Sequence, residues 1–401
     1  SMPRVGRLCA VSILAIVIMG LEAVPFNHDS EGYNADKLKE YFEDIAAWVM
    51  TLDVGSNNVT LNTTECKDSI FMNSNLARIL LASYKISGNT THLNEALRWC
   101  DTFFSLQQPT TTPTGESAGY WGTGYGPYPG HGDVYLADTG TAVQALAMCT
   151  HYVDTGKAMA YLDALAKYHR FVTLGCATPP PGRGKEPSNG WIIGDGPDKG
   201  ALGDGYYRGQ INLTPYTVAT ETTGAAFYAE YYALQRDDAY RKIALDAVNW
   251  ILNSRQPDGS IPYILNGASW SNTTYQPVSY SAEGFVSVSL RFGKSTSVAL
   301  NETVEWLLSN QNPDGTWGKL LSGDGQRSPR AVTILQLYAM DVTQDPRVMK
   351  AISKYLDYLL DPAQSAAYGV KKLSLVTGFV GLTVADIVQP WSTFGPPLSA
   401  H

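Results

Sequence analysis

The sequence predicts an all-α fold, an (α/α)6 toroid in which six helical hairpins form an inner and an outer ring. Two observations carry this prediction. Helical hydrophobic periodicity recurs in one segment after another with almost no strand pattern, and amphipathic segments alternate with apolar ones along the chain. An amphipathic helix keeps one face for water, whereas an apolar helix must be covered on all sides. The alternation therefore places the amphipathic helices outside and the apolar helices inside.

The outer helices follow one pattern. In the first of them Leu38, Phe42 and Ile45 recur on one face. Each of four outer helices also carries a tryptophan that is expected to pack in the core, namely Trp48, Trp99, Trp250 and Trp306. The outer helices are predicted over 33–52, 93–106, 158–172, 239–252, 297–308 and 347–360.

The inner helices are rich in small and apolar residues. The first of them stops before Gly88, a residue type that commonly ends a helix. They are predicted over 76–86, 138–152, 220–234, 281–292, 328–340 and 374–387.

An internal repeat supports the hairpin count. Residues 250–260 (WILNSRQPDGS) and 306–316 (WLLSNQNPDGT) align without a gap at the end of two outer helices. Proline prevents the helix from continuing, and Asp-Gly takes a tight turn. We therefore expect the two segments to be copies of one structural unit.

The composition limits the classes of function. With 44% hydrophobic and 16% charged residues the chain can bury a large core, so disorder is excluded. The net charge of -8 has the wrong sign for a protein that neutralises phosphate backbones, and no nucleic-acid partner is expected. The 24 Tyr and 9 Trp exceed what core filling usually requires, which favours flat, hydroxyl-rich ligands.

The amino-terminal segment predicts export. Arg4 and Arg7 precede an apolar stretch over 8–20, and the small Ala23 follows, as in a secretory signal. Residues 1–23 are thus expected to be a signal peptide or an N-terminal anchor. If this segment stays uncleaved, it is the only part of the chain expected to contact a membrane. Residues 24–401 are expected to form a single catalytic domain. Six Asn-x-Thr triplets also favour a secreted or secretory-pathway glycoprotein, at Asn58, Asn62, Asn89, Asn212, Asn272 and Asn301.

The cysteines leave two alternatives open. Cys66, Cys100, Cys149 and Cys176 could form one or two disulfides or remain as buried thiols. Their spacing has no metal-binding pattern, and the six histidines are scattered. We expect neither a metal nor a cofactor.

Long connections on one rim are the expected place for function. The connections from outer to inner helices cover 107–137, 173–219, 257–280 and 312–327, whereas those from inner to outer helices are short. Binding residues concentrate on loops that a rigid scaffold positions. The candidates for substrate binding in and beside these loops are Trp121, Tyr125, Tyr128, His131, Trp191, Tyr206, Tyr207, Arg208, Trp317 and Arg327.

Acidic residues at the starts of inner helices are the candidates for catalysis. Asp138, Glu221 and Glu283 are predicted in the first turns of three inner helices, so that they converge on one mouth, and Asp204 lies in a rim loop. Carboxyl groups on neighbouring inner helices could approach the separation of about 6.5 to 9.5 Å that inverting glycoside hydrolysis uses. The competing interpretation is that each acid only caps its helix, since carboxylates stabilise helix N-termini.

The predicted architecture resembles the six-hairpin glycosidase superfamily, which includes unsaturated glucuronyl hydrolases and (α/α)6 polysaccharide lyases. The resemblance covers residues 33–387, and Asp138-Thr139 is similar to the Asp-led helix starts of such hydrolases. It implies a carbohydrate-active glycoside hydrolase acting on oligosaccharides, including those with uronic acids. The Asp-Gly-Thr-Trp run ending at Trp317 is also similar to the Gln-Trp repeats of terpenoid cyclases, although their Asp-x-Asp-Asp motif is absent.

Three alternatives to a hydrolase remain open. A polysaccharide lyase would use a base and a cation, for which His131, Tyr206, Arg208 and Arg327 are candidates. A terpenoid or other small-molecule cyclase would need an apolar cavity and a proton donor. A non-catalytic glycan-binding module would need no catalytic carboxyl groups. The presence of two acids facing one cavity distinguishes these alternatives.

Overall fold

The computed structural model describes residues 34–52, 70–122, 134–178, 188–207, 210–265, 268–270, 275–320, 322–396 and 398. Several sequence predictions fall outside this described part: the segment 1–23, Cys66, the triplets at Asn58, Asn62 and Asn272, and Tyr125, Tyr128, His131 and Arg208.

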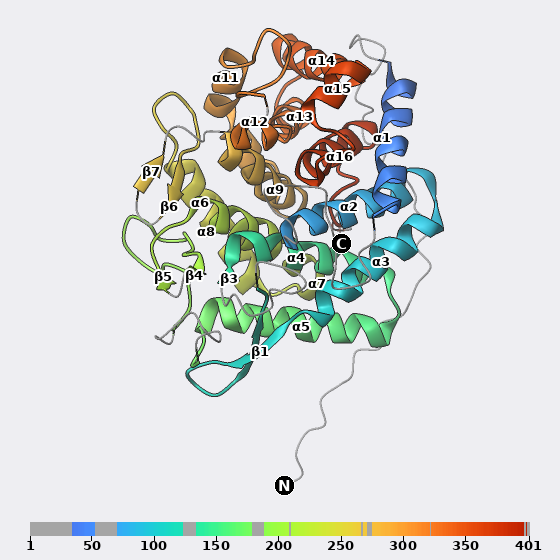
Figure 1. Cartoon of the computed structure of the whole chain (residues 1–401). Coiled ribbons are helices and arrows are strands. Elements are labelled where there is room, and N and C mark those ends of the chain that lie inside the picture. Colours follow the sequence, from blue (N-terminus) through green and yellow to red (C-terminus); the bar gives the residue numbers. More distant parts are fainter. Residues whose placement is uncertain are drawn as a thin grey trace.

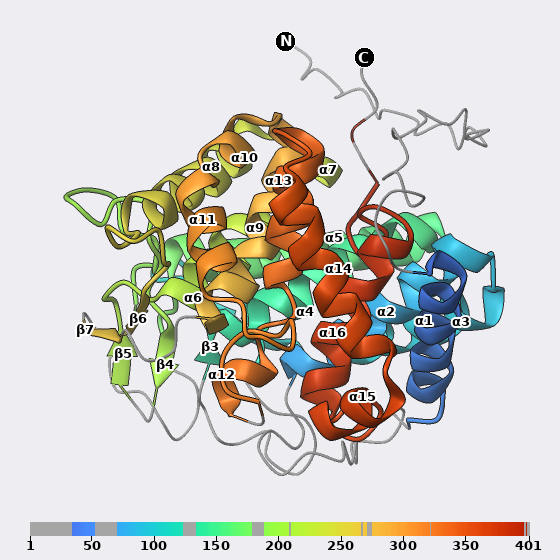
Figure 2. The same ribbon diagram turned by 90° about the horizontal axis from the view of Figure 1, so that it is seen from above.

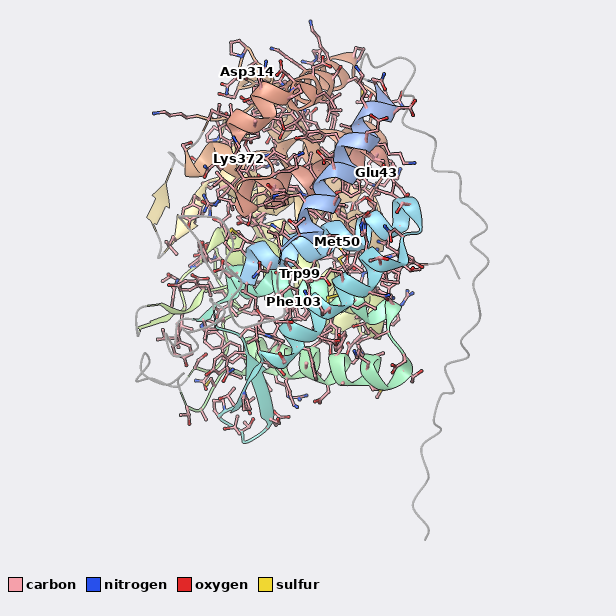
Figure 3. The ribbon with its side chains drawn as sticks, turned by 45° about the vertical axis from the view of Figure 1, so that its right-hand side comes forward. Glu43, Met50, Trp99, Phe103, Asp314 and Lys372 are labelled. Carbon is pink, nitrogen blue, oxygen red and sulfur yellow. A yellow bond between two sulfur atoms is a disulfide. The ribbon has the colours of Figure 1, made fainter. Side chains whose placement is uncertain are left out.

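The outer ring has the predicted amphipathic helices. They are α1 (Ala35–Met50), α3 (Thr90–Ser105), α5 (Thr155–Leu174), α8 (Asp238–Asn253), α11 (Asn301–Ser309) and α14 (Pro346–Leu360). Their apolar faces point inward, so that Trp99 and Phe103 of α3 are buried while Glu43 of α1 is exposed (Figure 3). Trp250 and Trp306 are buried as well, and Trp48 packs against the core while partly exposed, which confirms their predicted packing role.

The inner ring has the predicted apolar helices. They are α2 (Ile70–Ser87), α4 (Leu136–Cys149), the continuous run of α6 (Thr217–Ala219), the π-helical η3 (Thr220–Phe227) and α7 (Tyr228–Gln235), then α9 (Tyr275–Phe292), α13 (Ala331–Asp341) and α16 (Ser374–Val388). Each packs on the next one, and α16 packs on α2 to close the ring (Figure 1). The (α/α)6 toroid is therefore confirmed. Four short helices join these elements: η2 (Thr150–Tyr152), α10 (Ser295–Val298), α12 (Gly323–Gln326) and α15 (Pro362–Tyr368).

Two inner helices begin six residues earlier than predicted. Helix α9 begins at Tyr275 instead of residue 281, because Pro277 lies in the first turn, where proline costs no helical hydrogen bond. Helix α2 begins at Ile70 instead of residue 76. Its first two turns contain buried polar residues: Ser74 Oγ donates to the Ile70 carbonyl at 2.6 Å, whereas the side-chain amide of Asn73 has no hydrogen-bond partner within the described residues.

Short antiparallel strands lie in the long connections. Strands β1 (Gln108–Thr111) and β2 (Ser117–Tyr120) pair, as do β6 (Tyr263–Leu265) and β7 (Ala268–Trp270). Strands β3 (Val134–Tyr135), β4 (Gly205–Tyr207) and β5 (Gln210–Asn212) form a three-stranded sheet in which Tyr135 lies opposite Gly205. Figure 2 shows β3, β4, β5, α12 and α15 on one side of the molecule. This is the side where the inner helices begin, and we call it the open end.

The aligned repeat forms one structural unit twice. In each copy the aspartate of the Asp-Gly turn, Asp258 or Asp314, accepts hydrogen bonds from the N–H and the hydroxyl of the residue two positions later. The glycine then packs on the backbone of the next outer helix: a Cβ on Gly259 would lie 2.2 Å from the Glu302 carbonyl oxygen, and one on Gly315 would lie 2.4 Å from that of Lys354. The repeat therefore attaches each outer helix to its neighbour.

A charged cluster fills the interior beneath a layer of rings. Tyr280 of α9 and Phe379 of α16 meet inside the barrel with ring centroids 5.5 Å apart. One turn further along α9, Glu283 forms ion pairs with Arg78 at 2.6 Å and with Arg330 at 2.8 Å. Arg330 also pairs with Asp386 at 2.7 Å, so two cations and two anions neutralise each other.

The chain after α16 closes the other end of the barrel. Arg78 donates to the Thr393 carbonyl from Nε at 3.1 Å and from Nη2 at 2.9 Å. The Phe394 ring lies 5.2 Å from the Arg78 guanidinium carbon and 5.4 Å from that of Arg330. The Gly395 N–H points to Glu230 of α7 at 3.4 Å. We call residues 391–395 the closing segment.

One disulfide joins the two rings. Cys100 of α3 and Cys149 of α4 are bonded, whereas Cys176 is a buried free thiol. Both of the alternatives predicted for the cysteines thus occur in the same chain. Among the helices that the structure describes, none is long and apolar enough to cross a bilayer.

Candidate active site

Asp138 and Asp204 are brought together at the open end by the small β-sheet. Strand β3 leads directly into α4, whose third residue is Asp138, and Asp204 immediately precedes β4. Because β3 pairs with β4, the Leu136 N–H donates to the Asp204 carbonyl at 2.9 Å and the Ala137 N–H points to Asp204 Oδ1 at 3.4 Å. Two acids 66 positions apart in the sequence thus become neighbours.

The π-helical segment η3 fixes the turn that carries Asp138. Thr223 Oγ1 donates to the Leu136 carbonyl at 2.6 Å, and Thr222 Oγ1 donates to the Ala137 carbonyl at 2.7 Å. Gly140 permits this close approach, since a Cβ there would lie 2.6 Å from Thr222 Oγ1. π-Helical turns occur frequently at functional sites.

The surroundings raise the pKa of both carboxyl groups of this pair. Burial raises the pKa of Asp204 well above its ordinary value, and the nearby charge of Asp138 raises it further. Burial also raises the pKa of Asp138 to about 7, against the lowering effect of the Arg327 guanidinium. Neighbouring carboxyl groups with raised pKa values are suited to act as acid and base near neutral pH.

Asp138 is not the N-cap of its helix. Tyr135 occupies that position, and no hydrogen bond joins the Asp138 carboxylate to another residue of the described part of the chain. Asp138 is partly exposed at the open end, whereas Asp204 is buried. The helix dipole still favours the ionised form of Asp138, but a capping hydrogen bond does not explain its presence.

Two tyrosines that the sequence interpretation missed stand beside the acids. The hydroxyl groups of Tyr216 and Tyr263 are 2.9 Å apart. The charges of Asp204 and Asp138 act on both hydroxyls, and Arg327 acts on Tyr263 as well as on Asp138. Both tyrosines lie in the long connections predicted to carry function, and that position was the signal that could have identified them.

Glu221 is buried inside the inner ring. It lies in η3, the Ser281 hydroxyl donates to its Oε1, and Oε2 has no hydrogen-bond partner. Burial raises its pKa well above the ordinary value, against the lowering effect of the hydrogen bond from Ser281. Within the described residues no hydrogen bond or ion pair links it to Asp138 or Asp204.

The predicted first-turn position of Glu283 was wrong. Because α9 begins at Tyr275, Glu283 lies in the third turn, inside the charged cluster. Although its burial raises the pKa, the charges of Arg330 and Arg78 lower it below the ordinary value. Glu283 therefore carries a permanent charge that balances two arginines.

The predicted tryptophan contacts with a ligand also need correction. Trp121, Trp191 and Trp317 are each only 1% exposed. Their indole N–H groups donate to backbone carbonyls, at 2.6 Å for Trp121 and 2.9 Å for Trp317. Tyr206 is buried too, with its ring against that of Trp191. These rings pack the rim loops against the outer helices. For Tyr207 the structure describes only its place in β4.

The described glycosylation triplets differ in accessibility. Asn89 and Asn301 are exposed, whereas Asn212 is buried and its Nδ2 has no contact with solvent. Since glycosylation attaches the sugar to this nitrogen, Asn212 is not an acceptor in the folded protein. Asn89 also caps α3, its Oδ1 accepting from the Thr91 N–H at 3.0 Å.

The comparisons with known proteins identify the fold. No protein-family model matches the sequence. The Lin0763 protein of Listeria innocua superposes with a TM-score of 0.59 at 12% identity, over 87% of this chain and 96% of that one. The α-1,6-mannanase GH76A of Salegentibacter gives 0.58 at 10% identity, over 87% and 98%. The cellobiose 2-epimerase of Spirochaeta thermophila gives 0.57 at 12% identity, over 88% and 98%. The chain shares their fold.

One curated protein has a local sequence match. A segment of 102 residues is 28% identical to an ent-copalyl diphosphate synthase of a Streptomyces species. The match spans 25% of this chain and only 18% of that synthase.

Proposed function

We propose that this protein is a carbohydrate-active enzyme, a glycoside hydrolase that cleaves oligosaccharides by acid/base catalysis with Asp138 and Asp204. The observation that carries the proposal is the pair itself: two neighbouring carboxyl groups at the open end, both with a raised pKa. Glycoside hydrolysis requires one carboxylic acid to protonate the leaving oxygen and one carboxylate to activate water or attack the sugar.

The two environments assign the roles. Asp204 is buried, and its burial raises the pKa well above the ordinary value, which favours the protonated form, so we assign it as the general acid. Asp138 is partly exposed and titrates near pH 7, so it supplies the carboxylate. The positive charge of Arg327 beside Asp138 supports an anionic substrate group, such as the carboxylate of a uronic acid.

Neighbours of the same fold support the class of substrate. They include α-1,6-mannanases and cellobiose 2-epimerases. The inactive variants of the Salegentibacter mannanase replace two consecutive aspartates. In this chain the one pair of consecutive aspartates, Asp237 and Asp238, begins the outer helix α8. The mannanase arrangement is therefore not reproduced, and we do not extend α-1,6-mannan specificity to this chain.

We further propose that the protein works outside the cytosol. The exposed triplets at Asn89 and Asn301 and the Cys100–Cys149 disulfide support a secreted glycoprotein. Together with the amino-terminal pattern, they favour passage through the secretory pathway.

Conservative replacement of the acids tests the catalytic proposal. Asp138→Asn and Asp204→Asn are expected to lower turnover about 10²- to 10⁴-fold against the best substrate in a panel of neutral and uronic oligosaccharides, as loss of a general acid or base does. Hydrolysis is measured by the release of reducing ends.

Asp154→Asn is the matched control. Asp154 caps α5 through its Oδ1, and asparagine is an equally good N-cap. This variant should keep both turnover and melting temperature. Unchanged turnover in Asp138→Asn and Asp204→Asn would contradict the proposal.

A small-molecule cyclase is the second candidate. The local match to a copalyl diphosphate synthase and the Asp-Gly-Thr-Trp run at Trp317 favour it. Asp204, a buried carboxyl group with a raised pKa, could also protonate an alkene. If no oligosaccharide reacts while an isoprenoid diphosphate is converted in an Asp204-dependent way, this function replaces the hydrolase.

A further inference from the structure

Tyr216 and Tyr263 form a hydrogen-bonded pair with unequal access to solvent. Their hydroxyls are 2.9 Å apart and their rings meet edge to face, with centroids separated by 5.7 Å. Tyr216 is buried, whereas Tyr263 is partly exposed. Tyr263 is therefore the more accessible of the two tyrosines to a ligand at the open end.

The backbone holds both tyrosines in place beside Asp204. Thr217 Oγ1 donates to the Pro262 carbonyl at 3.0 Å and accepts from the Ile264 N–H at 2.8 Å. These two hydrogen bonds fix the backbone on both sides of Tyr263. The Tyr216 N–H donates to the carbonyl of Leu202, two residues before Asp204, at 2.8 Å. The two hydroxyls and the carboxyl group thus belong to one rigid unit.

Both hydroxyls remain protonated at working pH. Burial raises the pKa of Tyr216 well above its ordinary value, and the charge of Asp204 adds to this effect. Burial likewise raises the pKa of Tyr263, although the bond with Tyr216 lowers it. A hydrogen bond between two hydroxyls uses one proton, so one O–H remains for another partner.

We propose that Tyr216 donates its proton to the Tyr263 oxygen and that Tyr263 donates its own proton to a hydroxyl of the bound sugar beside the Asp138–Asp204 pair. Tyr263 is then a substrate-contacting residue, and Tyr216 is a positioning residue that acts through it. This inference rests on the proposed glycosidase function and adds a specificity-determining contact to that site.

Single and double replacements test the proposal with the oligosaccharide that the wild-type protein cleaves best. Tyr263→Phe should lower kcat/KM about 10-fold, the loss of one hydrogen bond of about 1.4 kcal/mol. Tyr216→Phe should lower it by a smaller factor. The double variant should be no worse than Tyr263→Phe alone, because Tyr216 acts only through Tyr263.

Tyr232→Phe is the matched control. Tyr232 lies on α7, where its ring contacts Phe292 away from the acids, and its replacement should leave kcat/KM unchanged. Equal and independent losses in the two single variants, adding up in the double variant, would overturn the positioning role. Wild-type kcat/KM in Tyr263→Phe would overturn the substrate contact while leaving the proposed function intact. Absence of cleavage by every protein, wild type included, would overturn the proposed function and this inference with it.

Discussion

At the scale of single residues, the sequence identified Asp138 and Asp204 but not what surrounds them. Asp138 was predictable because it opens a segment with the apolar pattern of an inner helix. Tyr216 and Tyr263 were not, because only the pairing of distant segments places their hydroxyls 2.9 Å apart. The rim tryptophans were wrongly predicted to contact a ligand. The sequence of a rim loop does not show that its aromatic rings pack inward against the outer helices.

The raised pKa of Asp138 predicts a pH-dependent cost in stability. Its pKa rises from 3.8 in the unfolded chain to about 7 in the folded protein, so the folded state binds the proton more tightly. The stabilisation by that proton is complete below pH 3.8 and is lost as the pH rises through 7. Asp138→Asn has no such loss.

Thermal unfolding between pH 4 and 8 measures this effect. Relative to the wild-type protein, Asp138→Asn should gain stability as the pH rises from about 4 to 7 and keep the gain above that range. A difference in melting temperature that does not change with pH would show that Asp138 titrates normally.

At the scale of elements, hydrophobic periodicity was sufficient to find both rings of helices, whereas their ends depended on other contacts. Helix α9 was predicted too short because Pro277 was interpreted as part of a loop. That error of six residues moved Glu283 from the third turn to the first. The strands were not predicted because segments of two to four residues carry too little alternation. The repeat was recognised, but its contact with the next outer helix needed the structure.

Replacing glycines by alanine separates two ways of losing unfolding free energy: backbone strain at a positive φ, and a steric clash with the next outer helix. Gly315 has a φ of 99° and no room for a Cβ, whereas Gly293 has a φ of 95° and nothing within 4 Å of such a Cβ. Gly293→Ala should therefore lower the free energy of unfolding by about 1 kcal/mol, through backbone strain alone. Gly315→Ala should lose clearly more, because α14 must also move away.

Urea denaturation of both variants gives the comparison. Equal losses of unfolding free energy would mean that the turn does not hold α14, contrary to the role assigned to the repeat.

At the scale of the whole molecule, an uncharged barrel interior would have been the simplest expectation from apolar inner helices. The structure instead places Arg78, Glu283, Arg330 and Asp386 in it, with the closing segment over them. Each lies among apolar residues in an inner helix or at its start, and only ring closure shows that they meet. Buried ion pairs are costly to break because a lone buried charge remains.

Removing one anion of the cluster is expected to destabilise the fold without changing the chemistry. Glu283→Gln should lower the free energy of unfolding by about 3 to 5 kcal/mol, since Arg78 and Arg330 lose a shared charge. Turnover measured well below the melting temperature should persist. Glu305→Gln, which removes an exposed partner of Arg347, should cost about 1 kcal/mol or less. A Glu283→Gln variant with normal stability and no turnover would return Glu283 to the catalytic site.

The closing segment has a consequence for biosynthesis. Arg78 receives its backbone partner from Thr393, which lies 315 residues later in the chain. At about 5 to 20 residues per second, a ribosome needs roughly 16 to 63 s to make that interval. During this time α2 has no α16 to close the ring, and its buried arginine lacks the carbonyl that it binds in the finished protein. The nascent barrel therefore has to be protected from aggregation until translation has passed the closing segment.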